Sequence, residues 1–175
     1  MPHTQRALIV IDLQNDYFPD GKYPLWNSEA VLDNCVAAIE RAHALDMPVI
    51  LVQHVADSSK GIAPFFNAGS AGVALHPRIL AAAPHAPVVV KRAADSFHET
   101  SLQATLDELG IRQLLLCGMM TQNCVTHTAL SRAADKYKVA VLADCCTTVD
   151  QMLHAIALNA LSIRVPLPTA AQALA

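Results

Sequence analysis

Residues 113–134 restrict the possible folds of this chain more than any other part of its sequence. The run 114–117 is apolar, the chain breaks at Gly118, and residues from Thr121 onward favour a helix. A buried strand that leads within a few residues into a helix is the repeating unit of parallel α/β sheets. Cys124 would then lie in the first turn of that helix. Free backbone N–H groups and the helix dipole there favour a thiolate, and the same amides could hold an oxyanion. A free cysteine is more often a small packing residue, but this position favours a reactive one.

Strands and helices alternate along the rest of the chain. Apolar runs predict strands at residues 7–13, 49–55, 87–91, 113–117, 138–142 and 163–167, the last being an edge strand that tolerates Pro166. Apolar spacing and capping residues predict helices that begin near residues 28, 101, 121 and 148. We therefore expect one domain over residues 1–175. Its predicted fold class is α/β, a three-layer αβα architecture with a central, mostly parallel, six-stranded sheet of Rossmann-like type.

The composition excludes several classes of protein. A hydrophobic content of 53% with 15% charged residues fits a compact, enzyme-like globule. The net charge of −3 and the lack of a basic run predict no nucleic-acid partner. We see no signal peptide and no apolar run of membrane-spanning length, and the five cysteines form no regular framework, so we expect a cytoplasmic protein with reduced thiols and no membrane partner. The apolar composition also suggests a homodimer or higher homo-oligomer.

Three chemically reactive residues are predicted at one edge of the sheet. Asp12 lies at the end of the first predicted strand, and Lys91 ends the third. Cys124 follows the fourth. Because the carboxyl ends of parallel strands meet at one edge, these side chains should lie close together. Asp12 could then take the thiol proton and Lys91 could stabilise the sulfur anion. One alternative pairs Cys124 with His127 on the same helix, and another is a non-catalytic scaffold that binds a small molecule.

Three segments that contain these residues resemble the isochorismatase-like cysteine hydrolase superfamily, which includes nicotinamidases and N-carbamoylsarcosine amidohydrolase. They are Ala-Leu-Ile-Val-Ile-Asp-Leu-Gln-Asn-Asp-Tyr-Phe at residues 7–18, Val-Val-Lys-Arg-Ala-Ala-Asp-Ser-Phe-His-Glu-Thr-Ser-Leu at 89–102, and Cys-Gly-Met-Met-Thr-Gln-Asn-Cys-Val at 117–125. The resemblance implies a catalytic triad of Asp12, Lys91 and Cys124 and a cis peptide bond between Met119 and Met120. It also implies an oxyanion hole formed by the N–H groups of Met120 and Cys124, and hydrolysis through a thioester.

The second predicted strand departs from the pattern of nicotinamidases, which carry an Asp-Trp-His metal motif after it. The corresponding residues here are Val-Gln-His-Val-Ala-Asp at 52–57, and His54 and His76 alone make a poor metal site. We therefore expect no metal and no cofactor, and an amidohydrolase acting on a non-peptide C–N bond. An isochorismatase-type or nicotinamidase-type hydrolase remains the alternative. Candidate substrate-binding residues, each of which could instead be a packing residue, are Gln14, Phe18, Trp26, His54 and Phe97.

Overall fold

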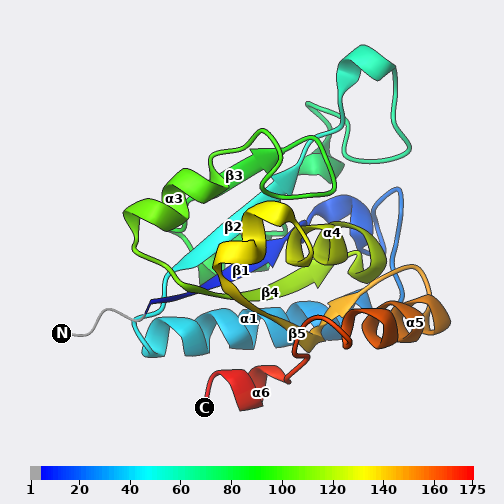
Figure 1. The fold of residues 1–175 in the computed structure, drawn as a ribbon. Helices are drawn as coiled ribbons and strands as arrows, with labels where there is room; N and C mark the ends of the chain where they lie inside the picture. Colours follow the sequence, from blue (N-terminus) through cyan, green and yellow to red (C-terminus); the bar gives the residue numbers. More distant parts are fainter. Residues whose placement is uncertain (1–4) are drawn as a thin grey trace.

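A five-stranded parallel sheet forms the centre of the computed structural model, which describes residues 5–175. The strand order is β3-β2-β1-β4-β5. The strands are β1 (Arg6–Ile11), β2 (Val49–His54), β3 (Val88–Lys91), β4 (Gln113–Met119) and β5 (Lys138–Thr147). Helices cover both faces, with α1 and α6 on one side of the sheet and α3 and α4 on the other in Figure 1. The predicted three-layer α/β fold is therefore confirmed.

The helices are mostly short, except for α1 and α5. They are α1 (Ser28–Ala44), α2 (Pro77–Ala82), α3 (Leu102–Glu108), α4 (Thr126–Ala129), α5 (Gln151–Leu161) and α6 (Ala170–Ala173). Short helical turns precede or follow several of them: η1 (Asn15–Tyr17), η2 (Ser58–Lys60), η3 (Ala71–Val73), η4 (Thr121–Val125) and η5 (Arg132–Lys136). No helix within residues 5–175 is long and apolar enough to cross a membrane.

Alternating residues of β1 divide the core between the two faces of the sheet. Leu8 and Val10 pack in the cluster that contains α1, whereas Ala7, Ile9 and Ile11 pack in the cluster beneath α3 and α4. All five are essentially buried. A strand covered on both faces needs no polar residue, which explains the continuous apolar run in the sequence.

The prediction of a sixth strand at residues 163–167 is wrong. The segment does lie beside β5, because the Val141 N–H donates to the Pro166 carbonyl at 3.0 Å and the Ala143 N–H donates to that of Pro168 at 3.1 Å. A parallel ladder also needs N–H groups that donate back, and in this register they would belong to residues 166 and 168. Both are prolines, which have no N–H group. The segment therefore follows the edge of the sheet without becoming part of it.

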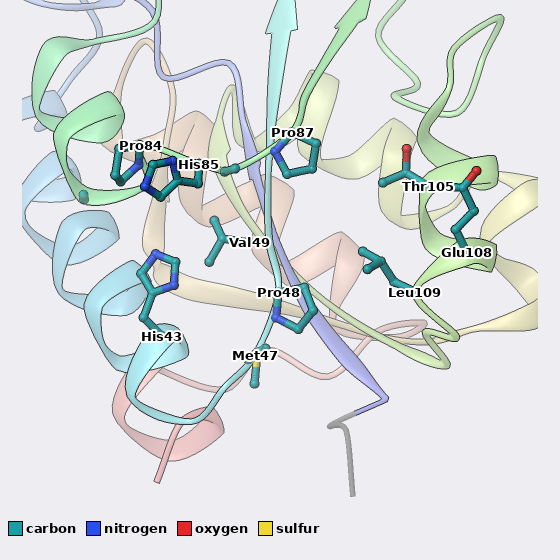
Figure 2. Close-up of a pocket in the computed structure, with 12 residues that line it drawn as sticks. His43, Met47, Pro48, Val49, Pro84, His85, Pro87, Thr105, Glu108 and Leu109 are labelled. Atoms are coloured by element: carbon teal, nitrogen blue, oxygen red, sulfur yellow. The ribbon is translucent and has the colours of Figure 1, made fainter. Parts of the chain in front are cut away.

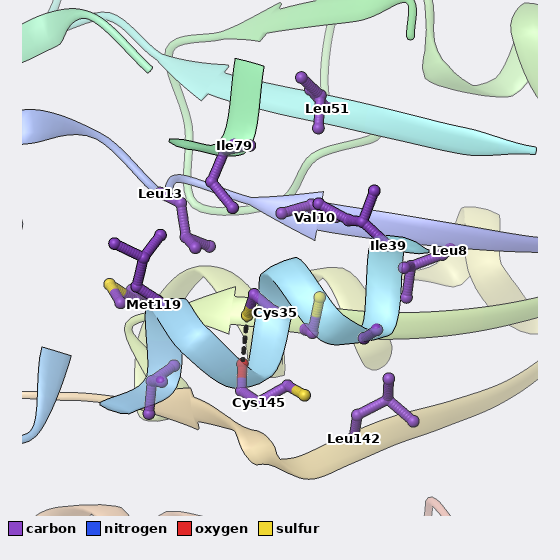
Figure 3. Packing of buried hydrophobic residues seen from close by; sticks show 14 of the residues in the cluster. Leu8, Val10, Leu13, Cys35, Ile39, Leu51, Ile79, Met119, Leu142 and Cys145 are labelled. Atoms are coloured by element: carbon purple, nitrogen blue, oxygen red, sulfur yellow. Dashed lines mark hydrogen bonds between the residues drawn. The ribbon is translucent and has the colours of Figure 1, made fainter. Parts of the chain in front are cut away.

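Two other predicted elements have different bounds. The helix predicted over residues 121–134 is divided into η4, α4 and η5, since Ser131 is extended and its hydroxyl caps η5 by accepting from the Ala133 N–H. The fifth strand continues to Thr147 through a bulge opposite Leu116 and Gly118. Cys145 lies in that bulge. Its carbonyl accepts a hydrogen bond at 3.4 Å from the buried Cys35 thiol of α1, the contact drawn in Figure 3.

Candidate active site

The carboxyl ends of four neighbouring strands position the candidate site. Asp12 follows β1, and its N–H still pairs with the Val52 carbonyl at 3.0 Å. His54 and Lys91 end β2 and β3 and are directly paired in the sheet register. Asp12 has a φ of 56°, a left-handed conformation that Asp adopts more readily than most residues, and there the chain turns away from the sheet.

The end of β4 brings Cys124 to the same edge. Gly118 has a φ of 123°, and a Cβ atom at this position would overlap the Ile11 carbonyl oxygen, so only glycine allows this close approach to β1. The Met119–Met120 peptide bond that follows is cis, at the position the family resemblance implies. The chain then enters η4, a single π-helical turn, in which the Cys124 side chain is buried.

The Lys91 ammonium is the centre of the site. Its Nζ lies 3.0 Å from Asp12 Oδ2, 3.1 Å from Cys124 Sγ and 2.9 Å from His54 Nδ1, and it donates to the Ala93 carbonyl at 2.9 Å. The Asp12 and Lys91 side chains are 0% exposed, and Cys124 is 1% exposed. The structure thus brings together all three residues of the predicted triad, with one cation in contact with both the carboxylate and the sulfur.

Burial determines the protonation of the sulfur. It raises the pKa of the Cys124 thiol, and the Asp12 carboxylate raises it further, whereas Lys91 lowers it by less. The expectation that this thiol ionises readily is therefore wrong for the closed site. Burial lowers the pKa of Lys91, but Asp12 and Cys124 outweigh that effect and the net direction is upward, so the ammonium stays charged. The single charges of Asp12 and Lys91 cancel, and a thiolate would add an unbalanced charge away from water.

His54 is neutral in this arrangement. Burial and the neighbouring Lys91 lower its pKa, against a smaller opposing effect of Asp12. Because Lys91 has only donors, Nδ1 must accept the hydrogen bond and the ring proton is on Nε2. His54 was predicted to line the substrate pocket, and the structure places it in contact with the triad instead.

Asp12, His54 and Cys124 offer oxygen, nitrogen and sulfur atoms that all lie within 4.8 Å of one another, a grouping that could hold a metal ion. The Lys91 ammonium, however, lies between 2.9 and 3.1 Å from one atom of each, which is the space such an ion would need. A zinc ion at about 2.0–2.3 Å from the same atoms would require Lys91 to leave. These residues therefore fit a site whose cation is the lysine.

The backbone around η4 limits which amides could stabilise an oxyanion. The N–H groups of Asn123 and Val125 donate to the Met120 carbonyl at 3.1 and 3.3 Å, so both are occupied. The predicted pair, the N–H groups of Met120 and Cys124, belongs to the same turn as the sulfur. His127 is exposed, and its Nδ1 bonds to the Asn123 carbonyl at 2.8 Å. No hydrogen bond joins His127 to Cys124 within residues 5–175, which removes support for the alternative base.

The other predicted pocket residues have the following packing partners. Gln14 is fully buried, and its amide bridges the backbone of His54 and the Val73 carbonyl. Phe18 packs against His76, with ring centroids 4.5 Å apart. Phe97 is buried and stacks on Tyr137. Trp26 is half-buried beside His154 of α5, with ring centroids 5.9 Å apart.

Tyr17 and Phe66 lie beside the site, and sequence reasoning did not identify Tyr17. Burial raises the pKa of Tyr17, and electrostatic interaction with Asp12 and Cys124 raises it further. The Phe66 ring lies 4.5 Å from that of Tyr17 and 5.9 Å from that of His54, measured between centroids. Phe66 is held by its N–H, which donates to Asp16 at 2.8 Å. The only sequence signal for Tyr17 is its position in the loop that follows Asp12.

A large hollow at the opposite end of the sheet does not contain the triad. Its volume is about 650 Å³, and its walls include His43, Pro48, His85, Pro87 and Leu109, which lie at the amino ends of β2 and β3 and the adjoining helix ends (Figure 2). The walls are largely apolar and include no cysteine or lysine. Ligand sites of open parallel sheets lie at the carboxyl ends, so this hollow is not the candidate active site.

Comparison with known proteins identifies relatives over most of the chain. The model of the Isochorismatase domain family matches residues 6–172. The isochorismatase family protein YddQ of Bacillus subtilis, which is uncharacterized, is 37% identical over 142 residues, covering 81% of this chain and 77% of YddQ. The "Probable inactive nicotinamidase At3g16190" of Arabidopsis thaliana is 26% identical over 180 residues, covering 93% and 91% of the two chains. A crystal structure of an isochorismatase-like hydrolase from Alkaliphilus metalliredigens is 26% identical, with a TM-score of 0.86 over 97% of this chain and 96% of that one.

Proposed function

The chain belongs to the Isochorismatase domain family, and from this premise we propose that it is a cysteine hydrolase acting on an amide or related C–N bond of a small molecule. The observation that carries the proposal is the position of Lys91 Nζ, 3.0 Å from Asp12 and 3.1 Å from Cys124. Moving the thiol proton to Asp12 transfers one negative charge from the carboxylate to the sulfur. Both positions adjoin the same ammonium, so the net charge of the buried site does not change.

The proposed reaction has two halves. As Cys124 Sγ forms a bond to the substrate carbonyl carbon, Asp12 takes the thiol proton and the carbonyl electron pair moves onto oxygen, held by the N–H groups of Met120 and Cys124. The C–N bond then breaks, Asp12 gives its proton to the leaving nitrogen, and a thioester remains. Water attacks the thioester while Asp12 takes a proton from it, the C–S bond breaks, and that proton returns to sulfur.

The alternative is a non-catalytic binder of small molecules, which the name of the Arabidopsis relative and the closed, protonated thiol both favour. Against it, this chain retains a carboxylate, an ammonium and a thiol in mutual contact, and a binder does not need that arrangement.

Intact mass spectrometry during incubation with a panel of small amides, ureas and N-carbamoyl compounds tests the proposal. We expect an acyl mass on Cys124 together with released amine or ammonia in the wild type. Both should be absent in Cys124→Ala and present in a His127→Leu control. Turnover by Cys124→Ala at the wild-type rate would refute the nucleophile assignment. Stoichiometric binding of a panel compound without adduct or amine release would favour the binder.

A further inference from the structure

We propose that His54 is a positioning residue, whose Nδ1 atom holds one N–H group of Lys91 away from Asp12 and so keeps Asp12 able to accept the thiol proton. This inference rests on the proposed hydrolase function and assigns His54 a role distinct from contact with the substrate.

The number of donors and acceptors around Lys91 is the first argument. An ammonium has three N–H groups, and Lys91 Nζ has four acceptors within 3.1 Å. His54 Nδ1 and the Ala93 carbonyl are the two shortest contacts, both at 2.9 Å, and both are neutral groups that remain unchanged during the reaction. They leave a single N–H group, which donates to Cys124 Sγ at 3.1 Å, while Asp12 Oδ2 lies 3.0 Å from the same ammonium as an ion-pair partner without a hydrogen bond. The sulfur therefore keeps an N–H group as it takes on negative charge, and the carboxylate oxygens stay open to the thiol proton.

The way in which His54 is held is the second argument. The Gln14 amide fixes its backbone on both sides, with Oε1 accepting from the His54 N–H and Nε2 donating to its carbonyl, each at 2.8 Å. The imidazole is itself close to Asp12 Oδ2, at 3.8 Å, and to Cys124 Sγ, at 4.0 Å. Only 20% of the His54 side chain is exposed, so water is a poor substitute for Nδ1.

The unpaired oxygens of Asp12 indicate how the site should respond to the loss of this acceptor. Asp12 Oδ1 and Oδ2 are both buried and neither has a hydrogen-bond partner within residues 5–175, so Oδ2 meets Lys91 Nζ as an ion pair alone. An N–H group released from His54 would turn to the charged carboxylate, which is a stronger acceptor than a neutral thiol. Asp12 would then be a weaker base, and the ammonium would move away from Cys124 Sγ. Both effects make the thiol harder to deprotonate.

Three substitutions separate this role from others. The amide oxygen of Asn can occupy the position of a histidine Nδ1, that of Gln can occupy the position of Nε2, and Leu offers no acceptor. His54→Asn, His54→Gln and His54→Leu are therefore compared with the wild type and with His127→Leu. Circular dichroism and thermal unfolding establish that each variant is folded.

Two measurements give independent readouts. The first is the rate of iodoacetamide modification of Cys124 between pH 6 and pH 11, followed by peptide mass spectrometry, which needs no substrate. The second is kcat/KM, with kcat and KM separated, for any panel compound that the wild type hydrolyses. In His54→Leu we expect alkylation of Cys124 at a given pH to slow about tenfold, the change that a rise of one unit in the thiol pKa produces, and kcat to fall about tenfold or more with KM little changed. His54→Asn should restore both values, and His127→Leu should match the wild type.

The proposal is overturned if His54→Leu is alkylated at the wild-type rate across this pH range, or if His54→Gln restores function and His54→Asn does not. The second result would assign the Nε2 side of the ring to substrate contact. A rise in KM alone would likewise indicate a pocket wall. If no panel compound is hydrolysed, the proposed function fails while the alkylation profile still decides the role of His54.

Discussion

Replacement of Lys91 by Met should destabilise the protein strongly, and a second substitution should reverse most of that loss. The Lys91 side chain is fully buried, and its ammonium is the cationic partner of the Asp12 carboxylate, at 3.0 Å. Removing one partner of a buried ion pair typically costs about 3–5 kcal/mol, because the other charge is left unbalanced. That cost is a large part of a total stability of about 5–15 kcal/mol. Lys91→Met with Asp12→Asn removes the unbalanced charge and should recover most of the loss.

Urea unfolding at pH 7.5, followed by circular dichroism, measures these free energies. A matched control is Lys60→Met, because Lys60 is 84% exposed and lies 4.0 Å from Asp57. It should stay within about 0.5 kcal/mol of the wild type. A Lys91→Met variant that loses less than about 1 kcal/mol, or a double variant no more stable than the single one, would refute the charge balance inferred for the site.

Three further predictions concern the sulfur and its access. In Asp12→Asn, Lys91 faces the thiol without a competing carboxylate, so the Cys124 pKa should fall. Iodoacetamide should then modify Cys124 faster than in the wild type at pH 7, while hydrolysis is lost. An unchanged rate of modification would contradict this prediction. Burial holds the Cys124 pKa above its unfolded value of about 8.5, so the neutral thiol makes its full contribution to stability below that pH. Above it, the free energy of unfolding should fall by about 1.4 kcal/mol per pH unit, because the unfolded chain loses the thiol proton first. Urea unfolding at pH 8 and 10 should thus show a shallower decline in Cys124→Ala, and parallel declines would be inconsistent with a buried neutral thiol. Phe66→Ala should lower the free energy of unfolding by about 3–5 kcal/mol and speed the alkylation of Cys124 by iodoacetamide. An unchanged alkylation rate would show that Phe66 does not restrict access to the sulfur.

The strands that position the site could be predicted from the sequence because each is a short apolar run followed by a break. The run in β1 has no polar residue until Asp12, and Gly118 interrupts the run in β4. The sixth strand could not be excluded in this way. Pro166 alone is tolerated at an edge, and only the register showed that Pro166 and Pro168 both occupy positions that must donate.

The candidate site was predictable in its residues but not in its electrostatics. The topology of a parallel sheet is sufficient to bring Asp12, Lys91 and Cys124 to one edge. The contact between His54 and Lys91 depends on the register of β2 and β3, and the position of Phe66 beside His54 depends on a loop without periodic signals. Neither can be derived from spacing along the chain.

Because the pKa of Cys124 is raised rather than lowered, the first attack in the proposed reaction needs a base. A thiolate already present in the free protein would need no base for its first attack, and Lys91 would be its counter-ion. The structure instead combines a protonated thiol with a carboxylate and an ammonium whose charges cancel. In the proposed reaction, proton transfer must then accompany attack, with Asp12 as the acceptor that keeps the buried charge constant. The same carboxylate makes the thiol inert before substrate arrives, since Asp12 and burial act on its pKa in the same direction. The proposed hydrolase would thereby have its reactivity tied to a bound carbonyl rather than to the free sulfur.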